Sequence, residues 1–167
     1  MPITIDSPEV MHELGVTLGA ALRPGDLVLL TGPLGAGKTT LTRGIGEGMQ
    51  VRGAVTSPTF VIARTHPSLV QGPPLVHVDA YRLGDATELD DLDIDLERSV
   101  VVAEWGADKF VNTHESWIEI VIERPAGSGD TGAETDDLER IEPRTLHVHA
   151  HGPRWSAEAL SQAGLLS

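Results

Sequence analysis

The sequence predicts an α/β protein built around a mixed, largely parallel central sheet. Short apolar runs of strand length alternate along the chain with segments whose apolar residues recur at helical spacing. The chain has 167 residues and shows no internal repeat, which favours one folding unit. We therefore predict a single domain that spans residues 1–167.

Each element follows from a local pattern. Residues 3–5 are expected to form an edge strand, and Ser7 followed by Pro8 is typical of a helix start. Apolar residues then repeat at helical spacing through residues 8–22, so one face of this helix packs inward. Further strands are expected at residues 26–31, 59–65, 75–79, 99–103, 116–123 and 144–150, and further helices at residues 40–49 (weakened by glycines) and 156–163.

Three segments between these elements have a different composition. Residues 67–74 are rich in turn formers and predict a loop. The acidic residues 85–97 are expected to form one or two short helices. Residues 126–137 combine Gly, Ser, Thr and acids, which predicts a mobile loop.

Composition limits the partners that this chain can have. Acids outnumber bases 25 to 12, and the formal net charge is −13, whereas a protein that grips nucleic acid alone usually has a basic face. We expect any RNA to be held by a partner protein. The absence of cysteine excludes disulfides and thiol chemistry. The chain shows neither a membrane-length apolar stretch nor a signal-like start, so we expect a cytoplasmic location without membrane contact.

Residues 32–40 carry the strongest motif, Gly-Pro-Leu-Gly-Ala-Gly-Lys-Thr-Thr, which matches the phosphate-binding P-loop. Its glycines let backbone N–H groups curl around an anion, and the helix start that follows adds further donors. The ammonium group of Lys38 would reach the β- and γ-phosphates, and the Thr39 hydroxyl would bind Mg²⁺. The predicted nucleotide-binding residues are Leu34, Gly35, Ala36, Gly37, Lys38, Thr39 and Thr40.

The alternative for this motif is a glycine-rich turn that binds nothing. The expected strand before the motif and the expected helix after it argue against that alternative, because a P-loop requires both. The architecture that we predict is therefore a three-layer P-loop NTPase-like fold.

A nucleotide hydrolase also needs a carboxylate near its metal ion. Asp79 and Glu104 each end an apolar run, and ligands of parallel α/β folds lie at the carboxyl ends of strands. The sequence does not decide which of the two would touch Mg²⁺. Either residue is also consistent with a helix cap or a surface acid.

Other polar residues are weaker candidates. Thr59 lies where a nucleotide switch senses the γ-phosphate, although a plain turn is equally consistent with its surroundings. Arg82 would serve as an internal arginine finger or as one half of a surface ion pair. We expect His77 to be a packed core residue, and the alternating histidines of residues 147–151 lack a nearby acid or cysteine that would complete a metal site.

Two absences narrow the substrate. The chain has no Asn-Lys-x-Asp motif of the kind that reads guanine, which favours ATP over GTP. It also lacks an arginine-rich lid of the kind that small-molecule kinases use. We therefore rank an Mg²⁺-dependent ATPase first, with a P-loop small-molecule kinase and a non-hydrolysing nucleotide-binding scaffold as the alternatives.

The motifs taken in order resemble those of the TsaE (YjeE) family, the ATPase component of bacterial tRNA threonylcarbamoyladenosine synthesis. The resemblance covers most of residues 3–124. The P-loop is shared by many families, so the specificity comes from the segments that follow it. The matching segments are residues 32–40, Ser57-Pro58-Thr59-Phe60, His77-Val78-Asp79-Ala80-Tyr81-Arg82-Leu83 and Glu104-Trp105.

The resemblance implies roles for particular residues. It implies that Thr39 and Glu104 hold Mg²⁺ and that Asp79 and Thr59 lie near the γ-phosphate, with Lys38 as a catalytic residue. Two supporting residues, Trp105 and Arg82, would lie beside the site. Ser7 and Arg144 would contribute contacts to the nucleotide.

The resemblance also implies two partner proteins, TsaB and TsaD, with tRNA bound only through them. The chain by itself would be a weak ATPase that is activated in the complex. The acidic residues 85–97 would suit docking onto a basic partner face, through Asp90, Asp91, Asp93 and Asp95. Two features depart from the family pattern, namely Pro33, where Asp is common, and the region from Ala126 onward.

Overall fold

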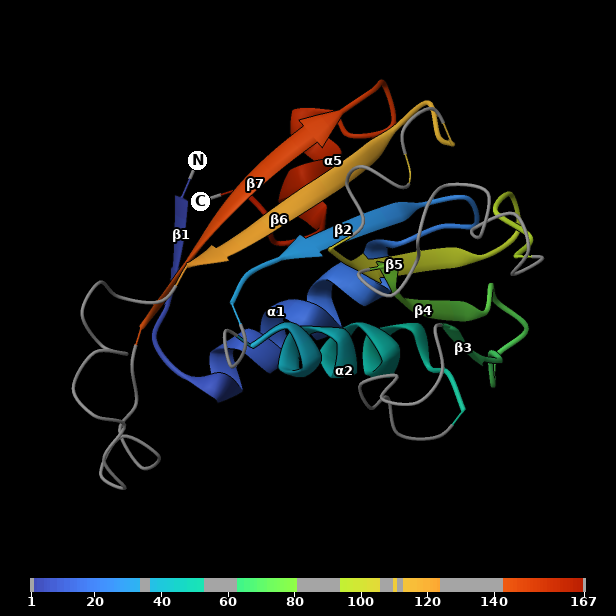
Figure 1. Cartoon of the computed structure of the whole chain (residues 1–167), viewed down its shortest axis with the longest axis horizontal. Helices are drawn as coiled ribbons and strands as arrows, with labels where there is room; N and C mark the ends of the chain where they lie inside the picture. The colour runs from blue at the N-terminus through green and yellow to red at the C-terminus, as the bar shows by residue number, and fades with distance from the viewer. Residues whose placement is uncertain are drawn as a thin grey trace.

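A computed structural model describes residues 2–33, 37–52, 63–80, 94–105, 110, 113–123 and 143–166 of this chain. These residues form a seven-stranded sheet with the strand order β1-β7-β6-β2-β5-β4-β3 (Figure 1). The strands are β1 (Pro2–Ile5), β2 (Leu27–Thr31), β3 (Ala63–His66), β4 (Leu75–Asp79), β5 (Val100–Glu104), β6 (Trp117–Glu123) and β7 (Arg144–His151), and the helices are α1 (Pro8–Ala21), α2 (Lys38–Met49) and α5 (Ala157–Gln162).

The sheet is mixed, as predicted, but its parallel part is confined to the centre. Strands β6, β2, β5 and β4 run parallel to one another. The outer strands join antiparallel, with β3 on β4 at one edge and β7 and β1 beyond β6 at the other. The four parallel strands therefore end at one edge of the sheet, which is the edge where we predicted the site.

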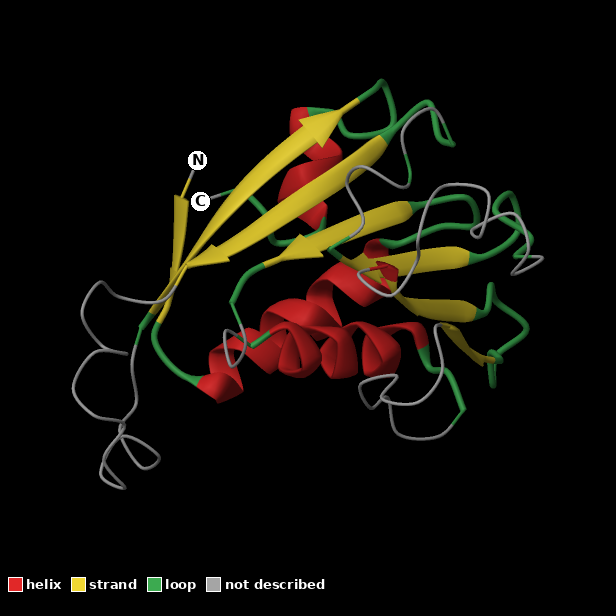
Figure 2. Cartoon of the chain, in the orientation of Figure 1, coloured by secondary structure: helices red, strands yellow, loops and turns green. Residues whose placement is uncertain are grey.

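The described helices all cover one face of the sheet. Side chains of α1, α2 and the segment around α5 share a core with the alternate residues of the strands, such as Leu30 and Val102. The opposite face has its own cluster, which includes Leu29, Val101 and Phe110. Figure 2 shows the helices grouped on one side of the strands.

Some predicted segments lie partly or wholly outside the described residues. Most of residues 85–97, where short helices were expected, lie outside the described residues, and the described remainder at 94–97 is not helical. The predicted mobile loop at residues 126–137 also lies outside them. The predicted strand at residues 59–65 is seen only as β3, which begins at Ala63 and ends one residue later than expected.

Helix α1 begins where its sequence signals indicated. The Ser7 hydroxyl accepts a hydrogen bond from the Val10 N–H (3.2 Å), and Pro8 occupies the first turn. The helix then buries one stripe of side chains that includes Met11, Leu14 and Leu18. No helix among the described residues has the length and apolar character needed to cross a membrane.

Helices α1 and α2 lie side by side and parallel, in close contact along four glycines (Figure 1). A Cβ atom on Gly44 would clash with the His12 carbonyl oxygen, and one on Gly48 would clash with that of Val16. We call this contact the glycine seam. It consists of Gly15 and Gly19 on α1 and Gly44 and Gly48 on α2. The glycines that weaken α2 as an isolated helix therefore permit its packing.

Candidate functional site

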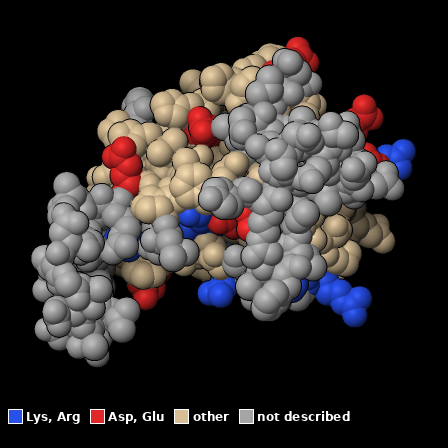
Figure 3. Space-filling view, viewed as in Figure 1, with Lys and Arg blue, Asp and Glu red and all other residues tan. Residues whose placement is uncertain are grey.

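The site forms where the ends of the parallel strands meet the start of α2 (Figure 1). Strand β2 leads through Gly32 and Pro33 toward Gly37, which caps α2. Strands β4 and β5 lie beside β2 and end at Asp79 and Glu104. In the space-filling view, basic and acidic groups adjoin between the end of β2 and the start of α2 (Figure 3).

Gly37 gives the helix start its shape. Its φ of +112° lies in the left-handed region, which glycine tolerates and other residues rarely adopt. The first helical hydrogen bond runs from the Leu41 N–H to the Gly37 carbonyl (2.9 Å). The N–H groups of Lys38, Thr39 and Thr40 precede this bond and have no acceptor within the helix, so the start of α2 offers donors to an anion.

Lys38 lies at the centre of the site although its side chain is buried. It is 8% exposed, and its ammonium group donates to the carbonyl oxygens of Gly32 (2.5 Å) and Pro33 (3.2 Å). Burial lowers the pKa of this ammonium group, while the Glu104 and Asp79 carboxylates oppose that shift. An ammonium group at this position can pair with an anionic group of a ligand.

The two predicted carboxylates are direct neighbours in the sheet. Asp79 and Glu104 are register partners across the β4–β5 pair, at the last residue of each strand. Glu104 is buried, and its Oε2 atom accepts a hydrogen bond from His77 Nε2 at 2.7 Å. The packed position predicted for His77 is confirmed, since its side chain is fully buried.

Trp105 follows Glu104 and lies over Lys38. The Lys38 Nζ atom is 4.9 Å from the centre of the indole ring, within cation–π range. The residue is 41% exposed, and its φ of +60° is unusual for a bulky side chain. The backbone N–H of Trp105 donates a hydrogen bond to the Leu30 carbonyl (3.0 Å), which connects this turn to β2.

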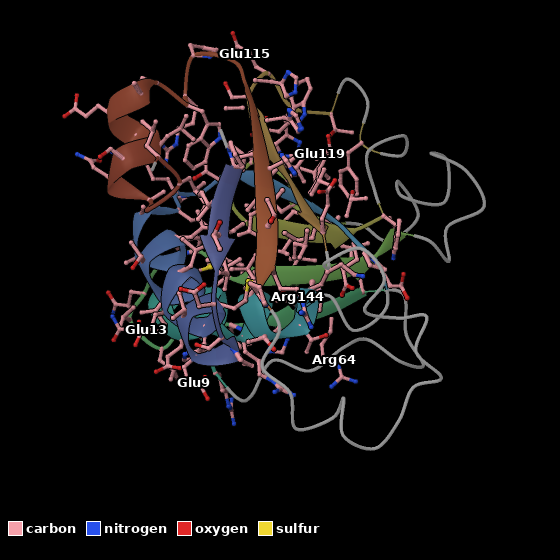
Figure 4. All side chains as sticks on the ribbon, turned by 90° about the vertical axis from the view of Figure 1, so that its left-hand side faces the viewer. Glu9, Glu13, Arg64, Glu115, Glu119 and Arg144 are labelled. Carbon is pink, nitrogen blue, oxygen red and sulfur yellow. The ribbon has the colours of Figure 1, made fainter. Side chains whose placement is uncertain are left out.

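Ser7 and Arg144 lie at the same edge of the sheet but farther from Lys38. Arg144 begins β7 and pairs in register with Ile5, two residues before Ser7 (Figure 4). Strand β6 separates β7 from β2, so two strand spacings, or at least about 10 Å, lie between Arg144 and the β2 backbone. A Cβ atom on Gly37 would lie 3.1 Å from the Met11 side chain, so the first turn of α1 packs close to the start of α2.

Several predicted site residues cannot be placed. Leu34, Gly35, Ala36, Thr59 and Arg82 lie outside the described residues, as do Asp90, Asp91 and Asp93 of the predicted docking segment. Asp95 is described and exposed, beside Arg98.

The donor set fits one way of binding Mg²⁺. Among the described residues, no group of three or more His, Cys, Asp or Glu side chains would enclose a metal ion. Mg²⁺ instead binds through one or two protein oxygens together with substrate phosphates and water. The Glu104 carboxylate and the Thr39 hydroxyl have the right chemistry for that mode. The expectation that no acid lies near the β7 histidines was wrong for His147, which pairs with Glu123 (3.1 Å) across the β6–β7 strands. His151 stacks on Trp117.

Sequence reasoning missed the bond between His77 and Glu104. The available signal was a histidine within an otherwise apolar run, two residues before Asp79 and therefore on the same side of the strand. The partner became clear only with the register, which places β5 beside β4.

Together these features define a mixed α/β protein in which a helix start and a buried lysine face two carboxylates at strand ends. Comparison with known proteins gives the family. The model of the family described as "Threonylcarbamoyl adenosine biosynthesis protein TsaE" matches residues 5–130. This chain belongs to the TsaE family.

Relatives with this name are similar over most of the chain. The tRNA threonylcarbamoyladenosine biosynthesis protein TsaE of Streptomyces coelicolor is 54% identical over 154 residues, covering 90% of this chain and 97% of the relative. The protein of the same name from Bacillus subtilis is 36% identical, covering 71% and 74%. The crystal structure of YdiB from Bacillus superposes with a TM-score of 0.68 at 26% identity, covering 98% and 93%.

Proposed function

We propose that this chain is a P-loop ATPase that binds and hydrolyses ATP with Mg²⁺ in the threonylcarbamoyladenosine modification of tRNA. The pathway follows from family membership. The ATPase chemistry is supported chiefly by one observation, the buried Lys38 between the loop carbonyls and the carboxylates of Asp79 and Glu104.

The side chains of this site have separate tasks. Lys38 and the first N–H groups of α2 bind the β- and γ-phosphates. Asp79, half-buried at the end of β4, orients the attacking water and accepts its proton. Trp105 covers the ammonium group of Lys38 and helps to exclude bulk water from it. Leu34, Gly35, Ala36, Thr59 and Arg82 belong to this proposal through the sequence motif alone.

Thr39 and Glu104 are the residues that would hold Mg²⁺. When bound, the metal ion neutralises charge on the phosphate oxygens. We assign the metal to Glu104 and the attacking water to Asp79, as the resemblance to the family implies. Ser7 and Arg144 would contact the nucleotide away from the phosphates, at the edge formed by α1 and β7.

We propose TsaB and TsaD as the partner proteins, with tRNA bound only through them. The support is family membership together with the acidic balance of 25 acids to 12 bases, which disfavours direct RNA binding. A pull-down with TsaB and TsaD, with and without ATP, tests this assembly. Tight, salt-sensitive binding of tRNA by this chain alone would contradict it.

The catalytic proposal is tested by phosphate release from ATP and Mg²⁺ without an added acceptor. Free phosphate supports an ATPase, whereas turnover that depends on an added acceptor supports a kinase. We expect Lys38→Ala to lose both nucleotide binding and turnover, because the phosphate charge is left uncompensated. We expect Asp79→Ala to retain binding and lose turnover, which a non-hydrolysing scaffold would not do.

Glu115→Ala is the matched control for Asp79→Ala. Glu115 is an exposed acid at the opposite end of the sheet from Arg144 (Figure 4). Its removal changes the net charge as Asp79→Ala does, but it should leave binding and turnover unchanged. Equal losses in the two variants would point to a general charge effect and contradict the role given to Asp79.

A further inference from the structure

His77 occupies a position where a histidine is costly. It lies in the middle of β4, on the face of the sheet that packs against the helices, and its side chain is fully buried. Its neighbours on this face include Leu75, Val100 and Val102, all of them fully buried. An apolar side chain would suit the packing better, because a buried polar group loses its hydration.

Only one end of the imidazole has a partner. Nε2 lies 2.7 Å from Glu104 Oε2, whereas Nδ1 is buried without a hydrogen-bond partner among the described residues. An ionised carboxylate accepts hydrogen bonds and cannot donate them, so the proton lies on Nε2. The hydrogen bond to Glu104 therefore offsets the cost of burying this ring, and the unpaired Nδ1 adds to that cost.

We infer that His77 is a positioning residue that fixes the Glu104 carboxylate for Mg²⁺ and ATP. Its Nε2–H group holds Oε2 on the core side of the strand. This bond engages only Oε2, and the Glu104 carboxylate also lies close enough to Lys38 to act on the pKa of its ammonium group. A hydrogen-bonded partner that orients a ligating carboxylate raises metal affinity without touching the metal. This inference rests on the proposed ATPase function.

The competing explanation is that His77 only stabilises the fold, and His66 provides the matched comparison. His66 lies on the neighbouring strand β3 and is also buried, with its Nε2 atom unpartnered among the described residues. It is hydrogen bonded to the backbone of Arg52 rather than to a carboxylate of the site. Replacing His66 thus tests the loss of a buried histidine, and replacing His77 adds the loss of the bond to Glu104.

The test is calorimetric titration with a non-hydrolysable ATP analogue, once in EDTA and once in Mg²⁺. The quantity of interest is the gain in affinity that Mg²⁺ confers. We expect His77→Leu to retain the affinity of the wild type in EDTA and to lose about tenfold of the gain from Mg²⁺. His77→Gln keeps an N–H donor near the former Nε2 and should recover part of that gain. His66→Leu should keep all of it.

A full Mg²⁺ gain in His77→Leu overturns the positioning role and leaves the ATPase proposal standing. An equal loss of affinity in EDTA and Mg²⁺ also overturns it, because a general structural effect would do the same. Absence of binding by the wild-type chain in both conditions overturns the proposed function together with this inference.

A second measurement uses the unmodified chain and so does not depend on the folding of a variant. Long-range ¹H–¹⁵N NMR of the imidazole rings reports which nitrogen of His77 carries the proton. We expect the Nε2–H tautomer with a downfield proton, and an upfield shift of that proton in Glu104→Gln. Protonation at Nδ1 alone would overturn the inference.

Discussion

A cation lies beside a carboxylate at each end of β2, but the two groups of residues are arranged differently. Before the strand, Arg154 binds Asp26 through both carboxylate oxygens (3.1 Å each) and also donates to the Ala21 carbonyl (2.9 Å). After the strand, Lys38 lies near two carboxylates and under Trp105, whose φ is positive. One of those carboxylates, Glu104, is bonded to His77, whose Nδ1 atom has no hydrogen-bond partner within the described part of the chain. In a group of residues that stabilises the fold, the buried polar atoms are hydrogen bonded to one another. In a binding site, some polar atoms are left to interact with a ligand.

The largest effect on stability is expected from breaking the ion pair between Arg154 and Asp26. Asp26→Ala leaves Arg154 without its carboxylate, although the guanidinium group is only 19% exposed. We expect a loss of about 3 kcal/mol in the free energy of unfolding, measured in urea. Arg98→Ala, in an exposed pair with Asp95, should cost below about 0.5 kcal/mol. Similar losses in both variants would show that burial of the first pair does not matter.

The second-largest effect on stability is expected at the glycine seam, because it packs α2, the helix that begins with Lys38, against α1. Gly44→Ala should destabilise the fold by about 2 kcal/mol, since the new Cβ clashes with the His12 carbonyl and pushes the helices apart. Helix propensity alone predicts the opposite sign, a gain of about 1 kcal/mol. Gly72→Ala, where the new Cβ would lie 3.4 Å from the Ser68 hydroxyl, is the tolerated control. Thermal unfolding distinguishes these outcomes.

A smaller effect is the pH dependence of stability that His114 contributes near Asp26, just before β2. Burial lowers the pKa of His114, and the nearby Asp26 opposes this shift. The unfolded chain therefore takes up a proton near pH 6.5 while the folded chain does not, so stability falls as the pH drops below 6.5. In His114→Gln, the stability lost between pH 7.5 and 5.5 should be smaller by up to about 1.4 kcal/mol. Between pH 7.5 and 8.5 the variant and the wild type should change in parallel, and an unchanged acid slope would contradict the assignment.

The smallest effect is expected between α1 and α2 at the surface. His12 and Glu47 lie 2.8 Å apart, but both side chains are well hydrated. Glu47→Gln should change the free energy of unfolding by less than about 0.5 kcal/mol. A larger loss would mean that this pair, rather than the glycine seam, holds the helices together.

Local patterns were sufficient to predict the edge of the sheet at which the candidate site lies. The motif around Lys38 and the acids that end two apolar runs identified Asp79 and Glu104, because parallel strands end at the same edge. Ser7 was predicted as a helix cap from two residues, and the structure confirms the cap. The contacts of Leu34, Gly35, Ala36, Thr59 and Arg82 remain predictions.

What could not be predicted depends on which elements become neighbours. The bond from His77 to Glu104 requires β5 to lie beside β4 in one particular register. From the sequence, the glycines of α2 predicted only a weak helix. Their role in close packing depends on α1 lying against them, which the sequence does not show. The extent of parallel pairing was overestimated for the same reason, since the sequence does not show where β3, β7 and β1 attach.

The glycine seam also limits how the molecule can respond to a ligand. Because each helix presses its backbone against the other, α2 cannot slide along its axis without dragging α1, and α1 follows β1 after only two residues. A displacement that begins at the Lys38 end of α2 would thus be transmitted mechanically to the far edge of the sheet, where β1 pairs with β7.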